Sequence, residues 1–371
     1  MVLQELVKSG NVASVGSVGK VGVPIYDKNN NRIKGIFTTV VHDKSGLSAV
    51  FSKVNEAEKE NPNADRTTFR AFVNRGLIDE IFMAQQLSRQ ERLVSSDVHL
   101  QVDGTAGPLM DSIRQAKEKI GIDLAYNIEG VIRTNGTVSG CDLVYFGKNT
   151  SVRTPNEKIR ALEGSSLLEA KQASQITPSS AYARLENGKY AIEVINDKTS
   201  PQDIDTMLAL YKEAYDLYTF PINHETIRIM LGNGNRAYVA RGEDGQISSV
   251  LVAEQATLRL DDGSTVNMYE LSDFATFRKD RGHGIITALQ IRATEDLRAN
   301  DPHAIVYAED RAPWKAVNKS SKQAGLEHAG TLQFHCSIIA DRDFSYSQNG
   351  EGHETYETLN VWAAPPAPKE Q

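Results

Sequence analysis

The sequence predicts a mixed α/β protein built from two domains, and three observations lead to that prediction. The chain has 371 residues, about twice the length of a domain of ~100–200 residues. Its second half alternates strand-like and helix-like segments around a strand-helix crossover, an order typical of a mixed sheet. Hydrophobic residues make up 40% of the chain and charged residues 24%, which is ordinary for a globular protein and excludes extensive disorder.

Residues 1–185 are expected to form an N-terminal α/β domain. Two-residue alternation predicts strands, and apolar spacing near 3.6 predicts helices. The expected elements are strands at Val21–Ile25 and Ile33–Val41, helices over Asn63–Leu87 and Pro108–Ile120, and a hairpin over Val131–Phe146. The hairpin rests on the turn sequence Thr134-Asn135-Gly136. Small polar residues are enriched over residues 147–188, and we place the domain boundary at the end of that segment. The helical piece Asn156–Lys171 within it is either a linker helix or the last helix of the first domain.

Residues 186–363 are expected to form the second domain, followed by a disordered tail over residues 364–371. Ser200-Pro201 is a helix-start signal, and Glu243-Asp244-Gly245 is a turn signal between two strands. The expected strands are Tyr190–Ile195, Ala237–Arg241, Ile247–Leu258, Thr265–Thr276, Ala304–Glu309, Leu332–Ile339 and Glu357–Trp362, and the expected helices are Ser200–Tyr218, Gly284–Leu297 and Trp314–Gln323.

Charge and cysteine content exclude several classes of protein. The 41 Lys and Arg against 48 Asp and Glu give a formal net charge of −7, so we expect no nucleic-acid partner and no anionic membrane partner. No apolar run approaches the ~20 residues of a membrane span, and the first residues lack the pattern of a secretory signal. Cys141 and Cys336 are too few for a disulfide scaffold or a cysteine-rich zinc site. A cytoplasmic protein without a bound metal is the expectation.

The segment Tyr269–Leu289 carries the strongest chemical pattern. A predicted strand runs into Arg281-Gly282-His283-Gly284, and a predicted helix follows at once. Glycines in such a turn let backbone N–H groups converge on an anion, and the helix N-terminus adds partial positive charge. Arg281 would add a fixed cation, so the turn suits a pyrophosphate. An ordinary surface turn between a strand and a helix is the alternative.

In this position, Arg281-Gly282-His283-Gly284 resembles the coenzyme A motif of the GNAT superfamily of N-acetyltransferases. Over residues 190–363 the chain is most similar to the bacterial and archaeal β-lysine N-acetyltransferases. Four stretches carry the resemblance in the family's order: Leu210–Ile222, Glu270–Gly284, Tyr307–Leu332 and Leu359–Trp362. The resemblance implies a GNAT acyl-CoA N-acyltransferase fold for the second domain and acetyl-CoA as the donor. The first domain is then an α/β domain for which a degenerate GNAT-like half is one reading.

The resemblance also implies which residues hold the donor. In GNAT enzymes the strand before the turn diverges from its neighbour and its backbone binds the pantetheine arm. Here that strand is Leu271–Thr276, with Phe274 and Thr276 as the backbone contacts and an N–H that can stabilise an oxyanion. The cofactor-binding residues implied are Phe274, Thr276, Arg281, Gly282, His283, Gly284, Ile285, Ile286 and Asn318. Ile286 stands where the superfamily usually has a small residue, and for Asn318 capping or packing is the alternative.

The attacking amine must lose a proton, so a carboxylate is needed near the thioester. Glu270 and Asp273 are the candidates. Their separation of three predicts opposite faces of the strand, and we prefer Glu270; a rim carboxylate or an ion-pair partner is the alternative for both. The tyrosine that many GNAT enzymes use as the acid is replaced by Ser321. Tyr307 is the candidate for that role, with a buried structural tyrosine as the alternative.

The resemblance implies an acetyl-CoA-dependent N-acetyltransferase that transfers acetyl directly to a primary amine of a small molecule, such as the diamino acid β-lysine. Tyr218, His224 and Arg311 are the candidate substrate-binding residues. A protein-lysine or amino-sugar acyltransferase, a longer acyl donor, and a non-catalytic CoA-binding sensor are the alternatives. The first domain has no catalytic motif, and its possible roles are shaping the acceptor site, binding a regulator or forming a homodimer.

Overall fold

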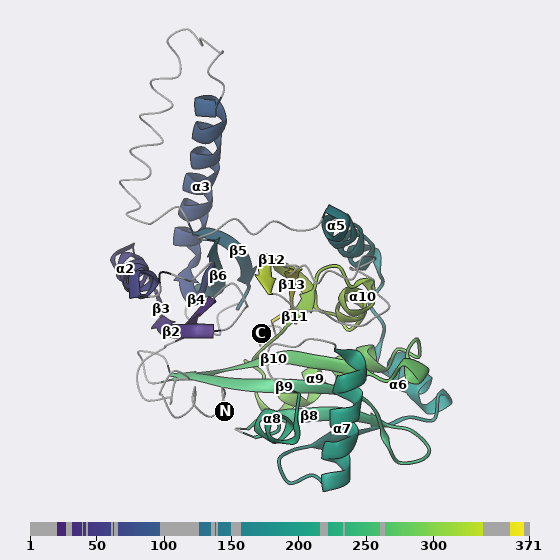
Figure 1. Cartoon of the computed structure of the whole chain (residues 1–371). Helices are drawn as coiled ribbons and strands as arrows, with labels where there is room; N and C mark the ends of the chain where they lie inside the picture. The colour runs from purple at the N-terminus through teal and green to yellow at the C-terminus, as the bar shows by residue number, and fades with distance from the viewer. Residues whose placement is uncertain are drawn as a thin grey trace, which may run out of the picture.

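The computed structural model describes residues 21–26, 32–38, 40–41, 44–60, 62, 66–96, 126–134, 138, 140–149, 157–215, 222–232, 234–259, 264–336 and 357–366. Within these residues the strands form one sheet in the order β2-β1-β4-β6-β5-β12-β13-β11-β10-β9-β8-β7, with β3 beside β4. Strands β10 and β11 pair in parallel, as do β3 and β4, while the other neighbours are antiparallel. Helices lie along this sheet (Figure 1). The predicted mixed α/β class is therefore confirmed.

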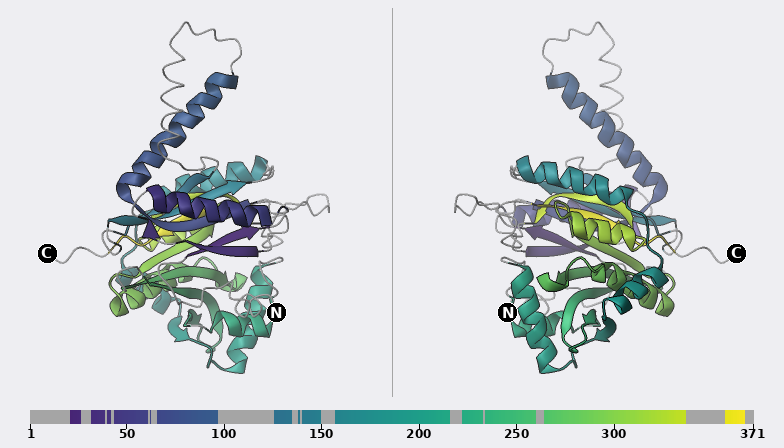
Figure 2. Two further views of the ribbon diagram at one scale, coloured as in Figure 1. Left: turned by 90° about the vertical axis from the view of Figure 1, so that its left-hand side faces the viewer. Right: turned by 90° about the vertical axis from the view of Figure 1, so that its right-hand side faces the viewer.

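The first half of the chain supplies one end of the sheet. Its elements are β1 (Val21–Tyr26), β2 (Arg32–Thr38), β3 (Val40–Val41), α2 (Lys44–Glu60), β4 (Arg66–Asn74), α3 (Arg75–Ser96), β5 (Asn127–Ile132) and β6 (Cys141–Asn149). Phe51 of α2 packs edge-on against Phe69 of β4 at 5.2 Å between ring centroids, and Phe69 stacks on Phe146 of β6 at 4.7 Å. Helix α3 extends away from the rest of the described chain (Figure 2).

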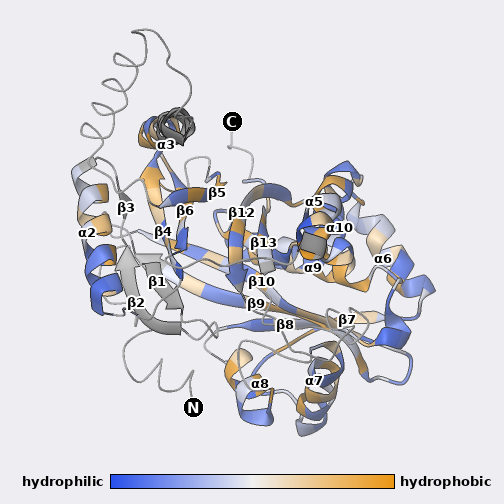
Figure 3. Cartoon of the chain, turned by 45° about the horizontal axis from the view of Figure 1, so that its top comes forward, coloured by the Kyte–Doolittle hydropathy of each residue, from blue (hydrophilic) through white to orange (hydrophobic). Residues whose placement is uncertain are grey.

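One helix expected here is wrong over its first part. Within Asn63–Leu87, residues 66–74 form β4, and the helix begins only at Arg75. Strand β4 is buried on both faces, so apolar residues occupy successive positions instead of alternating, and the hydrophobic stretch of β4 stands out in Figure 3. A short, fully buried strand cannot be distinguished from a helix by apolar spacing alone. Helix α2 was not predicted, the helix expected over Pro108–Ile120 lies outside the described residues, and the hairpin of β5 and β6 is confirmed.

The second half supplies the other end of the sheet and most of the helices. Its elements are α5 (Glu157–Gln172), α6 (Pro178–Asn187), β7 (Ala191–Ile195), α7 (Pro201–Ala214), α8 (His224–Met230), β8 (Arg236–Arg241), β9 (Ile247–Arg259), β10 (Thr265–Thr276), a 3₁₀ turn (Arg278–Asp280), α9 (Ile285–Asn300), β11 (Ile305–Arg311), α10 (Lys315–Gln323), β12 (Glu327–Cys336) and β13 (Glu357–Ala363). Ser200 caps α7 by accepting a hydrogen bond from the N–H of Asp203, as its Ser-Pro start indicated. The predicted order of strands and helices is confirmed, with α6 and α8 as additions to it. Strand β12 begins at Glu327, earlier than the predicted start at Leu332.

Helices cover both faces of this half of the sheet. Helix α9 buries Leu289 and Ala293 against Tyr238 and Leu271 on one face. Helix α7 buries Met207 on the other face, in a separate core. A third core joins the two halves of the chain, since Phe72, Leu143 and Tyr145 of β4 and β6 pack with Val266, Met268 and Tyr307 of β10 and β11. The site described below lies at the edge of this third core.

The two halves of the sheet meet where β5 pairs with β12. Their register contains the single pair Gly130 and Gly330. A Cβ atom on Gly330 would lie 2.2 Å from the Cα of Gly130 and 2.3 Å from the carbonyl oxygen of Glu129. Both of these atoms are backbone, so only glycine permits this approach.

Helix α5 precedes the predicted boundary at residue 185 and α6 spans it, yet both lie against the second half. Ser166 of α5 donates to the carbonyl of Pro313 at 3.0 Å, and α6 contacts α9. The division into two domains stays a prediction. The expected tail from residue 364 lies mostly outside the described residues, although Ala364 is buried and its N–H donates to Val306. In the part of the chain that is described, every helix is too short or too polar to cross a bilayer.

The close approach of Gly330 to Gly130 leads to a testable prediction. Gly330→Ala should lower the free energy of unfolding by about 2 kcal/mol or more, because the new methyl group meets backbone atoms that cannot move aside. The exposed Gly164 of α5 is a matched control, since a Cβ there meets nothing within 4 Å. Gly164→Ala should raise stability by roughly 0.5–1 kcal/mol through its better helix propensity. Urea unfolding of both variants measures the difference, and equal stability of Gly330→Ala and the unmodified chain would contradict the close approach.

Candidate active site

The turn after β10 has the shape of an anion site. Gly282 and Gly284 adopt φ angles of 86° and 73°, and α9 begins directly afterwards at Ile285. A Cβ atom on either glycine would meet nothing within 4 Å, so the backbone there faces open space. The first N–H groups of a helix have no partner within the helix and carry partial positive charge. The turn that the sequence predicted is therefore present, and its backbone is accessible to an anion.

Three side chains hold this turn in place through hydrogen-bonding contacts. The hydroxyl of Tyr190 donates to the buried carboxylate of Asp280 at 2.8 Å. The imidazole Nδ1 of His283 lies 3.1 Å from the carbonyl oxygen of Asp280, and the Nε of Arg281 donates to the carbonyl of Thr276 at 3.1 Å. These contacts tie the turn to β10 and leave the guanidinium of Arg281 at the exposed surface beside the glycines. Ile285 and Ile286 pack into the core under α9.

Strands β10 and β11 diverge just before this turn. Their parallel register runs through Met268, Tyr269 and Glu270, and Glu270 opposite Tyr307 is its last pair. Strand β10 continues to Thr276 paired with β9, whereas β11 continues to Arg311 paired with β13. The backbone of β10 beyond Glu270 therefore borders a gap in the ladder, as the resemblance implied.

A bulge in β10 shapes the same segment. Asp273 and Phe274 lie between the register pairs of Ser272 and Ala275, and Asp273 has a φ of 53°. Phe274 packs toward the core of α9, and its carbonyl accepts from the hydroxyl of Tyr215 at 2.7 Å. The side chain of Thr276 is hydrogen-bonded to Ser249 at 2.7 Å.

This bulge also bears on the expected orientation of Asp273. Opposite faces for Glu270 and Asp273 require regular alternation, which the bulge interrupts. The carbonyl of Asp273 accepts from the hydroxyl of Tyr211 in α7 at 3.1 Å, and its side chain is buried. The pKa of Tyr215 is raised by burial and by the charge of Asp273. Asp273 is thus next to the tyrosines of α7, and its role as a base stays a prediction.

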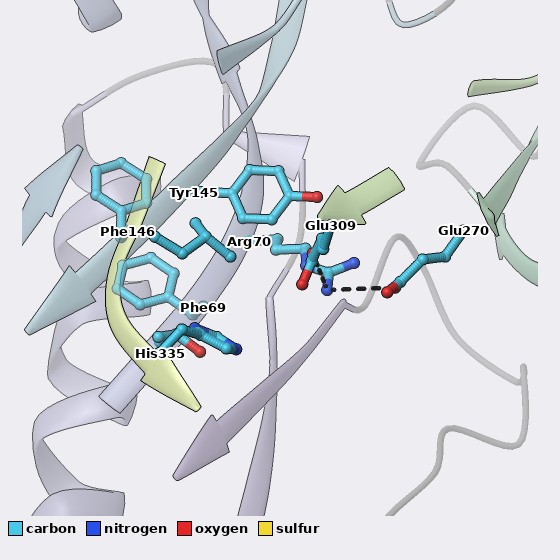
Figure 4. Close-up of a pocket in the computed structure, with 9 residues that line it drawn as sticks. Phe69, Arg70, Tyr145, Phe146, Glu270, Glu309 and His335 are labelled. Carbon is cyan, nitrogen blue, oxygen red and sulfur yellow. Dashed lines mark hydrogen bonds and ion pairs between the residues drawn. The ribbon is translucent and has the colours of Figure 1, made fainter. Parts of the chain in front are cut away.

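Glu270 lies in a cluster that joins the two halves of the chain. The hydroxyl of Tyr307 donates to Oε2 of Glu270 at 3.0 Å. Arg70 of β4 donates from Nη1 to the oxygen of Tyr307 at 2.5 Å and from Nη2 to Oε1 of Glu309 at 2.9 Å. The same Nη2 is 3.8 Å from Oε2 of Glu270, so the guanidinium lies between the two glutamates (Figure 4). The sequence placed Glu270 and Tyr307 in the site, and the structure brings them into direct contact.

The surroundings of Glu270 favour its protonated form. Burial raises the pKa of Glu270 well above its usual range, and the neighbouring carboxylates Glu309 and Glu254 raise it further against the opposing charge of Arg70. Burial likewise raises the pKa of Tyr307. A carboxylate whose pKa lies closer to neutral pH is a better proton acceptor for catalysis than an ordinary exposed one.

Asn318 of α10 is held entirely by protein groups. Its amide nitrogen donates to the carbonyls of Arg311 at 2.9 Å and Trp314 at 2.8 Å. Its amide oxygen accepts from Asn360 at 2.8 Å and from the indole of Trp362 at 3.1 Å. The side chain is fully buried. These contacts support the packing alternative for Asn318, and its cofactor role stays a prediction without further support.

Ser321, at the position of the missing tyrosine, belongs to a buried chain of hydrogen bonds. Its hydroxyl donates to Oδ2 of Asp310 at 2.6 Å and accepts from Gln290 of α9 at 2.7 Å. Gln290 accepts from Ser320 at 2.8 Å, and Ser320 is hydrogen-bonded to Thr287 at 2.9 Å. Burial raises the pKa of Asp310 to about 7. This series of hydrogen bonds therefore links α9 and α10 to β11 near the start of α9.

Two of the three predicted substrate-binding residues, His224 and Arg311, fall within the described part of the chain. His224 lies at the start of α8, half exposed, with Nε2 2.7 Å from Asp205. The guanidinium of Arg311 lies 5.2 Å from the ring centroid of Trp314. Tyr218 lies outside the described residues. The roles of all three stay predictions.

Sequence reasoning missed the residues that the first half contributes. Arg70, Tyr145 and Phe146 line a cavity with Glu270 and Glu309. No local pattern marks them, because they are single polar or aromatic residues on ordinary strands. Their importance follows only from the sheet order that brings β4 and β6 near β11. In the described part of the chain, no group of three His, Cys, Asp or Glu side chains has the geometry of a metal site.

A comparison with curated proteins finds one similar relative, and no family model matches the chain. The relative is a β-lysine N(6)-acetyltransferase from Methanosarcina mazei, 27% identical over 160 residues, which are 43% of this chain and 51% of the relative. The chain thus spans about half the length of the relative that it matches. The resemblance expected from the sequence is confirmed at this level.

Solved structures similar to part of the chain are also acetyltransferases. The ribosomal-protein-S18-alanine N-acetyltransferase from Escherichia coli is 14% identical with a TM-score of 0.35 and covers 49% of this chain and 97% of its own. A GCN5-related N-acetyltransferase from Kribbella flavida is 18% identical with a TM-score of 0.35, and the match covers 47% of this chain and 98% of that one. A spermidine N-acetyltransferase mutant from Vibrio cholerae is 9% identical with a TM-score of 0.33 and covers 47% and 92%.

The raised pKa of Asp310 predicts how stability depends on pH. The carboxyl is protonated in both states below its unfolded pKa of 3.8, and the folded chain loses stability as pH rises through the folded value of about 7. At ~1.4 kcal/mol per pKa unit, this loss amounts to a few kcal/mol. Asp310→Asn should flatten the decline in unfolding free energy between pH 4 and pH 8, whatever its effect at a single pH.

Urea unfolding across that pH range measures the effect. Asp197→Asn, at an exposed position, is the matched control and should leave the shape of the curve unchanged. Parallel curves for Asp310→Asn and the unmodified chain would contradict a neutral buried carboxyl at Asp310.

Proposed function

We propose that the protein is an acetyl-CoA-dependent N-acetyltransferase that transfers acetyl directly to a primary amine of a small molecule, with a diamino acid such as β-lysine as the first acceptor to test. One observation carries the proposal: β10 and β11 diverge at Glu270 and Tyr307, and β10 then leads into the glycine turn at the start of α9. A carboxylate suited to accept a proton thus lies at one end of an unpaired strand edge, and an anion site lies at the other. The similarity to a β-lysine N(6)-acetyltransferase supports the same reading.

The turn residues fit the phosphates of coenzyme A. Both glycines have open space over the backbone, and Arg281 offers a cation beside the N-terminus of α9. The backbone of Phe274 and Thr276 on the diverging edge would hold the pantetheine arm. When bound, acetyl-CoA supplies an activated thioester.

Glu270 would act on the acceptor. It would take a proton from the acceptor's ammonium group and leave the neutral amine that can attack. Tyr307 donates a hydrogen bond to Glu270 and would hold the carboxylate in place. Its hydroxyl is also our candidate for the acid that protonates the leaving thiolate. Neither Cys141 nor Cys336 lies in the segment that binds the donor, which supports direct transfer. With Glu254 and Glu309 nearby, the site is rich in carboxyl groups, which suits a cationic amine.

Glu270→Gln tests the base. The amide cannot accept the amine's proton, so kcat/KM with acetyl-CoA and a responsive amine should fall about 10²–10⁴-fold. Glu295→Gln on the exposed side of α9 is the control and should retain activity. In the unmodified protein kcat/KM should rise with pH through a pKa above the ordinary glutamate value, because the base must be ionised and its pKa is raised. Full activity of Glu270→Gln would exclude it as the base, and CoA binding without turnover of any amine would favour the sensor alternative.

Two substitutions of Gly284 test whether the turn binds the phosphates of coenzyme A. Gly284→Asp places a negative charge at the N-cap of α9, where it suits the helix but repels phosphate. Gly284→Asn has nearly the same shape without the charge, and both residues tolerate the left-handed backbone better than most. The CoA dissociation constant from calorimetry should be at least about tenfold larger for Asp than for Asn, and the gap should narrow at high salt. Equal affinities of the two variants would place the phosphates elsewhere.

A further inference from the structure

A cavity of about 190 Å³ lies between the two halves of the chain, next to Glu270. Strands β4 and β6 of the first half form one side of it, and β10, β11 and β12 of the second half form the other. An apolar cavity of ~150 Å³ holds benzene, so this one has room for a small organic molecule. The wall toward β6 is aromatic, whereas the end near Glu270 and Glu309 is acidic (Figure 4).

Tyr145 of β6 presents an unsatisfied polar group in this cavity. Its side chain is 3% exposed, and its hydroxyl has no hydrogen-bond partner among the described residues. In Figure 4 the hydroxyl points toward the end of the cavity where Arg70 and Glu309 lie. A buried hydroxyl without a partner costs about 1–3 kcal/mol, so such a group in a ligand-sized cavity indicates a hydrogen bond that a ligand completes.

The chemistry around Tyr145 selects the kind of group it would bind. Burial raises the pKa of Tyr145 well above its usual range, so the hydroxyl stays protonated and is a donor at neutral pH. The guanidinium carbon of Arg70 is 4.9 Å from the centroid of the Tyr145 ring. Arg70 also contacts Glu309 and Tyr307, so its positive charge offsets that of the glutamates beside the Tyr145 hydroxyl and lets an anionic acceptor atom approach. A hydrogen bond from a neutral donor to a carboxylate is among the stronger ones in proteins.

We infer that Tyr145 binds the carboxylate of an amino-acid acceptor, so that the first half of the chain selects a diamino acid over the corresponding diamine. This inference rests on the proposed acetyltransferase function and gives the first half a role in it. The acceptor's amine faces Glu270 of the second half, and its carboxylate faces Tyr145 and Arg70 of the first half. The cavity size excludes a folded protein as the molecule enclosed there.

Two acceptors test the inference: β-lysine, and 1,4-diaminopentane, which is β-lysine without its carboxylate group. With acetyl-CoA as donor, Tyr145→Phe should lower kcat/KM for β-lysine about 10- to 100-fold, mainly through KM, since one hydrogen bond to a charged group is lost. The value for the diamine should not change. Tyr238→Phe, at a buried tyrosine in the core under α9, is the matched control and should alter neither acceptor, and thermal unfolding checks that both variants fold.

The outcomes distinguish a failure of the inference about Tyr145 from a failure of the proposed acetyltransferase function. An equal fall for both acceptors, no change for either, or a preference of the unmodified protein for the diamine would overturn the role of Tyr145 while leaving the acetyltransferase in place. Turnover of no amine at all by the unmodified protein would overturn the proposed function and the inference with it. Calorimetric binding of β-lysine to the CoA-loaded protein gives a second readout, in which Tyr145→Phe should weaken binding by the same factor.

Discussion

The end of the β10–β11 ladder is the constraint on which the rest of the site depends. Two parallel strands that stop pairing leave backbone donors and acceptors without a partner strand, which is unfavourable in a buried place unless something else binds them. Here the ladder ends at Glu270 and Tyr307, and a bulge then turns β10 toward the start of α9. Side chains of the protein meet part of this need, since the carbonyls of Phe274 and Thr276 accept from Tyr215 and Arg281. Under the proposed function, an extended donor would pair with the rest of this edge.

Charged side chains from both halves of the chain meet where β10 and β11 diverge. Glu254, Glu270 and Glu309 come from three strands of the second half, and like charges held together in a buried site destabilise one another. Arg70, which lies between Glu270 and Glu309, comes from β4. The cation, the shared core of β4, β6, β10 and β11, and the close approach of Gly130 to Gly330 hold the two halves together around the acidic cluster. The first half of the chain therefore helps to hold the acidic cluster together.

Local features of the site could be predicted from the sequence, and features that depend on the sheet order could not. The turn at Gly282 and Gly284 is specified within a few residues, as is the start of α9. Glu270 and Tyr307 followed from a resemblance in the same half of the chain. Arg70 and Tyr145 carry no local pattern, because their role arises from strands distant in sequence that become neighbours in space.

The errors have equally physical causes. Strand β4 was taken for part of a helix because burial on both faces removes the alternation that identifies a strand. The predicted relation of Asp273 to Glu270 assumed a regular strand, whereas a bulge interrupts the alternation between Ser272 and Ala275, where the sequence has no glycine or proline. That relation therefore stays a prediction. In both places tertiary packing decides what the local sequence leaves open.

The serine at position 321 illustrates how a small side chain can have consequences across the site. The hydroxyl of Ser321 is within hydrogen-bonding distance of both Gln290 and Asp310. The resulting chain of hydrogen bonds reaches Thr287 in the first turn of α9. That turn presents the first N–H groups of α9, so the start of this helix is linked through Asp310 to β11, the strand that also carries Tyr307 and Glu309. Under the proposed function, this link would make the position of the phosphate-binding end of the gap depend on the position of the end at Glu270.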